Sequence, residues 1–131
     1  MSLQDIIGEY GFVAKVNVSD LDVSAAWYDR KLDLYLDSKF STPTWRQLYI
    51  YEMPQVAIGL ALNPEGVGSG GAVSTFVVQD IVTARNNLIE QGVEVGLIQQ
   101  VSEDVFVCFF KDPDGNMLGL RQNSSIQPNS D

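Results

Sequence analysis

The sequence predicts an α+β fold built from two tandem βαβββ units. Two observations predict the duplication. The segment 18–21 (Val-Ser-Asp-Leu) is matched by 78–81 (Val-Gln-Asp-Ile), and the same offset, from Asp20 to Asp80, places Ile58-Gly59-Leu60 on Leu118-Gly119-Leu120. A glycine-rich segment at 63–71 separates the two halves. We therefore expect a pseudo-twofold arrangement of two similar units.

The length and composition are those of one compact domain. The chain has 131 residues, of which 45% are hydrophobic and 19% are charged, so a buried core is expected. We expect a single domain over 1–131, with the first unit at 11–66, the second unit at 71–122 and a polar tail at 123–131.

Each half begins with a strand followed by a capped helix. A strand is expected at 12–18 and another at 75–78, because both segments are rich in β-branched residues. Asp20 and Asp80 follow these strands and can cap a helix. Apolar residues then recur at helical spacing, and Gly92 is expected to end the second helix because glycine readily adopts a positive φ.

The remaining strands complete each unit. Hairpins are expected from 45–52 to 55–62 across a turn at Met53-Pro54, and from 105–111 to 117–121 across the turn 112–116. Asp112 and Asp114 are assigned to that second turn as structural residues. Short strands are expected at 36–40 and 94–99. Because one helix covers only one face of a sheet, the two uncovered faces are expected to form a curved sheet around a cleft.

Charge and residue usage exclude several function classes. The net charge of −9 argues against nucleic acid or an anionic membrane as a partner; it suits a cationic ligand or serves solubility alone. The absence of histidine excludes Ser-His-Asp and Cys-His catalysis and any metal site that uses histidine. The single cysteine, Cys108, excludes an intrachain disulfide and is interpreted as an inert core thiol. With no apolar run long enough for a membrane span and no signal peptide, a cytoplasmic protein is expected.

Two motifs resemble those of a known superfamily. The segment 17–24 (Asn-Val-Ser-Asp-Leu-Asp-Val-Ser), running into Trp27-Tyr28, and the segment 110–118 (Phe-Lys-Asp-Pro-Asp-Gly-Asn-Met-Leu) are similar to motifs of the vicinal oxygen chelate superfamily. That superfamily groups glyoxalase I, extradiol dioxygenases, fosfomycin-resistance enzymes and bleomycin-resistance proteins. The resemblance covers about 11–122 and implies a glyoxalase/bleomycin-resistance-like fold and a homodimer.

The resemblance also implies where a divalent metal would be bound. In metal-binding members, His, Gln or Glu occupies four positions that correspond here to Val13, Gly59, Val73 and Gly119. None of these residues has a donor side chain, whereas a hard divalent cation needs several oxygen or nitrogen ligands. We therefore predict no metal and no cofactor.

Strand alternation predicts which residues line the cleft. The residues that alternate with the expected helix-facing set include aromatic side chains and a few polar groups, as a ligand pocket requires. The predicted ligand-binding residues are Lys15, Asn17, Trp45, Gln47, Tyr49, Tyr51, Thr75, Phe109, Met117 and Arg121. For the aromatic residues, packing that closes the cleft or a dimer face is the alternative, and for Lys15 and Arg121 the alternative is a solvated side chain.

The sequence therefore predicts a metal-independent protein that binds a small molecule and sequesters an aromatic or cationic compound or antibiotic. One alternative is a metal-free lyase, isomerase or other enzyme of the superfamily that uses Lys15 or a cleft tyrosine for proton transfer. A second alternative is a structural or regulatory module whose cleft is filled by its own side chains or by a partner. The sequence favours a protein that is not an enzyme, and it leaves the ligand, the pathway and the oligomeric state open.

Overall fold

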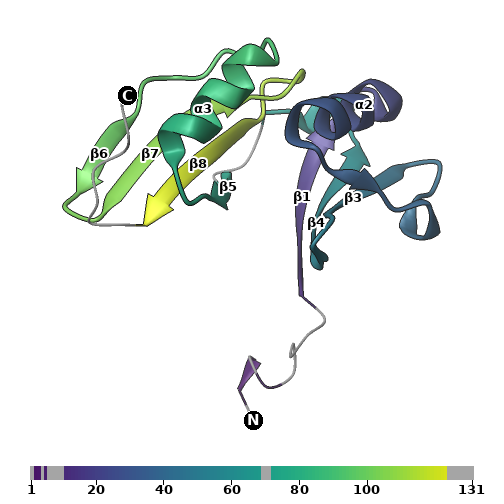
Figure 1. Ribbon diagram of the computed structural model, residues 1–131. Helices are drawn as coiled ribbons and strands as arrows, with labels where there is room; N and C mark the ends of the chain where they lie inside the picture. The colour runs from purple at the N-terminus through teal and green to yellow at the C-terminus, as the bar shows by residue number, and fades with distance from the viewer. Residues whose placement is uncertain (1, 4, 6–10, 69–71, 124–131) are drawn as a thin grey trace. The chain divides into compact units, whose positions relative to one another are not determined.

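The computed structural model describes residues 2, 3, 5, 11–68 and 72–123 (Figure 1). The chain divides into two compact units, Met1–Val67 (unit 1) and Gly68–Asp131 (unit 2). Each unit contains a four-stranded sheet and one helix of ten or more residues. The predicted α+β fold with two tandem βαβββ units is confirmed.

Unit 1 is a mixed sheet with one helix. Its strand order is β1-β4-β3-β2, in which β1 runs parallel to β4 and the other neighbours are antiparallel. Its elements are β1 (Phe12–Val18), α2 (Leu21–Leu32), β2 (Tyr35–Leu36), the 3-10 helix η1 (Ser38–Phe40), β3 (Trp45–Ile50), β4 (Met53–Leu62) and the 3-10 helix η2 (Pro64–Gly66).

Unit 2 repeats this topology. Its strand order is β5-β8-β7-β6, in which β5 runs parallel to β8 and the other neighbours are antiparallel. Its elements are β5 (Ser74–Val77), α3 (Ile81–Glu90), β6 (Gln99–Ser102), β7 (Val105–Lys111) and β8 (Met117–Asn123).

In each unit the core lies between the helix and one face of the sheet. In unit 1, Leu48 and Leu60 on the sheet and Tyr28 on α2 are fully buried. In unit 2, α3 lies over β7 and β8 (Figure 1), where Cys108 and Leu118 are buried with Ile81 of the helix. Because neighbouring side chains on a strand alternate between faces, the remaining face of each sheet is left uncovered by its own helix.

Both helices begin at the predicted aspartates. The Asp20 carboxylate accepts a hydrogen bond from the Val23 backbone N–H at 3.0 Å. The Asp80 carboxylate accepts from the backbone N–H groups of Val82 at 3.1 Å and Thr83 at 3.2 Å. Each cap satisfies backbone donors that have no partner within the helix. As predicted, a glycine with a positive φ follows α3: Gly92 has φ 85°.

The predicted turn at Met53-Pro54 is wrong. The β3–β4 hairpin turns at 51–52, where Ile50 pairs with Met53, and Pro54 lies inside β4. Pairing of β4 with β1 begins only at Val56. The missing N–H of Pro54 therefore removes no pairing with β1, which is why a proline is tolerated near the start of this strand.

The short strands are also placed differently from the prediction. Instead of a strand at 36–40, β2 covers only Tyr35–Leu36, and η1 follows because the Asp37 side chain accepts a hydrogen bond from the Lys39 N–H at 3.2 Å. Instead of a strand at 94–99, β6 covers Gln99–Ser102. In the segment that precedes β6 in the sequence, the carbonyls of Val95 and Gly96 accept hydrogen bonds from the Arg85 guanidinium at 3.2 Å and 2.8 Å.

Smaller differences concern strand ends. The strands predicted at 45–52, 55–62, 75–78 and 117–121 are observed at Trp45–Ile50, Met53–Leu62, Ser74–Val77 and Met117–Asn123. Asn123, which was expected in the polar tail, is the last residue of β8, and 124–131 lie outside the described residues. No helix in the described part of the chain is long and apolar enough to cross a membrane.

Candidate functional site

The sequence-predicted site residues belong to both units. Six of them lie in unit 1, on β1, on β3 and in the turn after β3, and four lie in unit 2, on β5, β7 and β8. On the strands they alternate with the buried core residues, which places them on the sheet face that the helix leaves uncovered. We call this the open face of each unit.

On the open face of unit 1, the Trp45 indole covers Gly59. A side chain at Gly59 could not be built without overlapping the Trp45 ring. The indole N–H of Trp45 donates to Oε1 of Gln47 at 3.2 Å, and Gln47 is the residue of β3 that pairs with Gly59. Two predicted site residues are thus in direct contact, and the aromatic ring of one of them lies against Gly59.

Unit 2 has a similar arrangement at the matching position. A Cβ atom at Gly119 would lie 3.0 Å from Oγ1 of Thr75 and 3.3 Å from the Phe109 ring. Phe109 is the residue of β7 that pairs with Gly119, and Thr75 is its neighbour on β5. In both units, an aromatic ring from the adjacent strand therefore contacts the glycine of the repeat.

These positions do not fit a divalent metal site. Val13 and Val73 present exposed apolar side chains, and the space beside Gly59 is occupied by an indole ring. Within the described residues no three His, Cys, Asp or Glu side chains come close enough together to hold a metal ion. A hard cation would find none of the oxygen or nitrogen ligands that it needs at the four positions.

The polar site residues differ in their surroundings. Lys15 is exposed on β1. The Nδ2 group of Asn17 donates to the Gly66 carbonyl at 3.2 Å, which links β1 to η2. Arg121 is exposed and its guanidinium donates to Oδ1 of Asn123 on the same strand. Because the Lys15 side chain is exposed, the geometry does not place it in an enclosed site beside a bound substrate, as proton transfer requires.

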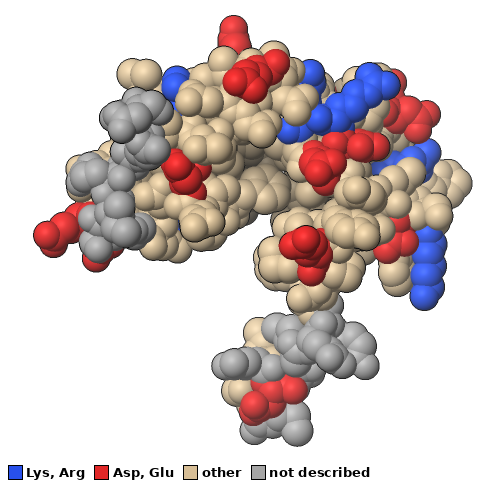
Figure 2. All heavy atoms as spheres, in the orientation of Figure 1, with Lys and Arg blue, Asp and Glu red and all other residues tan. Residues whose placement is uncertain are grey.

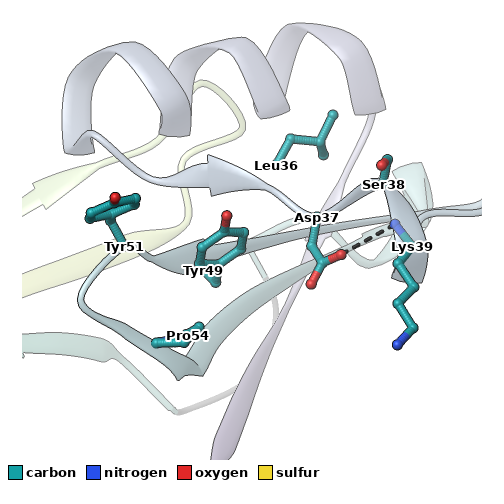
Figure 3. A pocket seen from close by; sticks show the side chains of 7 residues that line it. All are labelled: Leu36, Asp37, Ser38, Lys39, Tyr49, Tyr51 and Pro54. Atoms are coloured by element: carbon teal, nitrogen blue, oxygen red, sulfur yellow. Dashed lines mark hydrogen bonds between the residues drawn. The ribbon is translucent and has the colours of Figure 1, made fainter.

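Tyr49 and Tyr51 line a pocket at the edge of unit 1 (Figure 3). Its volume is about 630 Å³. We call it the tyrosine pocket; its lining residues are Leu36, Asp37, Ser38, Lys39, Tyr49, Tyr51 and Pro54. The sequence predicted the two tyrosines as site residues. It missed the four residues at 36–39 because that segment was expected to be a strand, and it missed Pro54 because that residue was expected in a turn. The signal in the sequence for the segment 36–39 was Asp37, whose side chain can accept a hydrogen bond from the backbone and so start the 3-10 helix η1.

Cys108 and Asp112, two other residues considered in the sequence analysis, have surroundings that indicate a structural role. Cys108 is fully buried, and this burial raises the pKa of its thiol. Asp112 is also buried, and its carboxylate accepts hydrogen bonds from the N–H groups of Asp114 and Asn116, both at 2.9 Å. Asp112 thereby organises the β7–β8 turn, in agreement with the structural role predicted for it.

Comparison with known families gives one match over most of the chain. The sequence model of the Glyoxalase/Bleomycin resistance protein/Dioxygenase superfamily matches residues 9–120. Among curated proteins, none matches the sequence.

Several solved structures share the fold. TnmS3, an antibiotic binding protein from Streptomyces sp. CB03234, is 22% identical with a TM-score of 0.73, and the match covers 87% of this chain and 95% of that one. A glyoxalase/bleomycin resistance protein from Catenulispora acidiphila DSM 44928 is 23% identical with a TM-score of 0.68, over 86% and 96% of the two chains. A lactoylglutathione lyase from Agrobacterium tumefaciens is 14% identical with a TM-score of 0.65, over 85% and 91%. At these identities the likeness shows the fold.

Proposed function

Because the chain belongs to the Glyoxalase/Bleomycin resistance protein/Dioxygenase superfamily, we propose that it is a metal-independent protein that binds and sequesters a small aromatic or cationic molecule. The observation that carries this proposal is the Trp45 indole lying against Gly59, where metal-binding members would place a ligand side chain. An aromatic surface in place of metal ligands suits a ligand held by stacking and burial.

The remaining open-face residues supply the other contacts of such a site. Gln47 and Tyr49 in unit 1 and Thr75 and Phe109 in unit 2 combine apolar area with a few polar groups, as small-molecule sites do. We propose that the open face of each unit carries residues for ligand binding and that the protein acts as a cytoplasmic homodimer. The antibiotic binding protein from Streptomyces has the same fold, so antibiotics are one ligand class to include.

Tryptophan fluorescence tests this proposal directly. The chain has two tryptophans, and a Trp27→Phe variant leaves Trp45 as the sole reporter on the open face. We expect aromatic and cationic compounds from a chemically diverse library to change Trp45 emission. The same compounds should raise the melting temperature, because a ligand that binds only the folded state stabilises it in proportion to RT ln(1 + [L]/Kd).

Matched variants separate specific binding from general effects. Gln47→Leu removes the hydrogen-bond partner of the Trp45 indole and should weaken binding, whereas Lys111→Met, at the end of β7, should not. The titrations are carried out with and without EDTA, which should leave the affinity unchanged. If no library compound alters either Trp45 emission or the melting temperature, the proposed function is wrong.

A further inference from the structure

Three tyrosines form an aromatic cluster at the tyrosine pocket: Tyr49 and Tyr51 line it, and Tyr35 lies beside them. The ring of Tyr35 lies 5.0 Å from that of Tyr51 and 5.9 Å from that of Tyr49, measured between centroids. Tyr35 pairs with Tyr49 across β2 and β3, which places both on the open face of unit 1. Tyr51 is 65% exposed and Tyr35 is 42% exposed, so much of this aromatic surface is accessible to a ligand.

The carboxylate of Asp37 lies in the same pocket, to the right of Tyr49 in Figure 3. Its Oδ1 atom accepts a hydrogen bond from the Lys39 backbone N–H at 3.2 Å. Its Oδ2 atom takes part in no hydrogen bond with the residues that the structure describes. The pocket therefore offers a carboxylate oxygen that a bound cation could contact.

The ammonium of Lys39 does not neutralise this carboxylate. The Lys39 side chain extends away from the Asp37 carboxylate (Figure 3), and its Nζ atom lies 5.4 Å from the centroid of the Phe40 ring. No salt bridge joins the two side chains, since the one found among the described residues is between Arg46 and Asp22. Aromatic faces and an unneutralised carboxylate are the two groups that attract organic cations.

We propose that the tyrosine pocket binds an aromatic organic cation, with its ring on the faces of Tyr49 and Tyr51 and its ammonium group against Asp37. This inference rests on the proposed function and narrows its ligand class. A planar ring gains stacking area on the tyrosines, and the positive charge is attracted both by the ring faces and by the carboxylate. An anionic compound would meet the Asp37 carboxylate on a chain whose net charge is −9.

Three small probes that differ in charge test the inference. Phenylethylammonium, neutral 2-phenylethanol and anionic 3-phenylpropanoate are titrated into the ¹⁵N-labelled 131-residue protein. We expect phenylethylammonium to shift the backbone amide signals of Asp37, Lys39, Tyr49 and Tyr51, with clearly weaker effects from phenylethanol and none from phenylpropanoate.

Variants then assign the contacts. Asp37→Asn retains an acceptor for the Lys39 N–H, so η1 is preserved, and it should weaken phenylethylammonium binding by about fivefold. Asp29→Asn removes the same charge from an exposed position on α2 and should change binding by less than about twofold. Tyr51→Phe should retain binding and Tyr51→Leu should lose much of it, because only the first keeps the ring.

The outcomes separate this inference from the proposed function. Equal binding of the ammonium and the alcohol, or equal effects of Asp37→Asn and Asp29→Asn, would overturn the cation site. Shifts centred on Trp45 and Gly59 in place of the tyrosine pocket would also overturn it while leaving the proposed function intact. If no probe shifts any signal, the cation site is wrong, and the fluorescence titration of Trp45 with the wider library decides the proposed function separately.

Discussion

Gly59 and Gly119 show how a single residue type decides what the open face can do. At both positions an aromatic ring occupies or contacts the space that a side chain would need. The contact is closer at Gly59, where the added atom would overlap the Trp45 ring, than at Gly119, where the nearest atom is the Thr75 hydroxyl at 3.0 Å. The two glycines therefore hold an aromatic surface in place of ligand side chains.

A series of glycine substitutions measures this packing. Gly59→Ala should lower the free energy of unfolding by about 1–3 kcal/mol, because the extra methyl group forces the Trp45 indole to move. Gly119→Ala should cost less, because its neighbours need to shift by only a few tenths of an ångström. Gly96→Ala is the control: its Cβ would lie 3.4 Å from the Phe109 carbonyl, an ordinary contact, so we expect a change within about 0.5 kcal/mol. Urea denaturation checks the order, and equal effects at Gly59 and Gly96 would contradict it.

Cys108 is expected to make stability depend on pH at the alkaline end. Burial raises the pKa of its thiol above the ordinary value of 9.0, so the folded state holds this proton more tightly than the unfolded state does. The resulting stabilisation is complete below the unfolded pKa and is lost as pH rises through the folded pKa. As pH rises above about 8, the free energy of unfolding should therefore fall less in Cys108→Ala than in the wild type. Parallel pH curves from urea denaturation would show that the thiol makes no contribution.

Among the secondary-structure elements, α3 depends on a side-chain cap. The Asp80 carboxylate accepts two backbone hydrogen bonds and a third from the Thr83 hydroxyl at 3.0 Å. Asp80→Ala should lower the free energy of unfolding by about 1 kcal/mol, whereas Asp80→Asn keeps the acceptor and should lose only a fraction of that. Thermal and urea unfolding measure the difference. Equal losses in the two variants would mean that the carboxylate charge, and not the hydrogen bonds, stabilises the helix.

The elements that were predicted correctly are those with strong local signals. The strand at 12–18 alternates and is β-branched, and both helices follow a capping aspartate. Two of the wrong predictions, the strands at 36–40 and 94–99, fall where a side chain forms hydrogen bonds with backbone groups. Asp37 ends β2 by capping η1, and the Arg85 guanidinium, which comes from a helix, binds the Val95 and Gly96 carbonyls. Such hydrogen bonds are not visible as a periodicity in the sequence.

The whole chain carries a net charge of −9, and its electrostatic field should attract cationic ligands before they contact the protein. Dissolved salt screens this attraction, with a Debye length of about 10 Å at 0.1 M. The affinity for phenylethylammonium should therefore fall severalfold when salt is raised from about 20 mM to about 200 mM. The affinity for 2-phenylethanol should stay nearly constant and serves as the control. Isothermal titration at the two salt concentrations makes the comparison, and a cation affinity that ignores salt would argue against electrostatic attraction.

The sequence by itself determined the duplication, the order of elements in each unit and the lack of donor side chains at Val13, Gly59, Val73 and Gly119. These features follow from residue type and periodicity, which act over a few neighbouring residues. Only the tertiary structure decided that the Trp45 indole covers Gly59 and that Asp37 shares a pocket with Tyr49 and Tyr51. Those contacts depend on strand register and on a 3-10 turn beside an edge strand, which bring together residues that are distant along the chain.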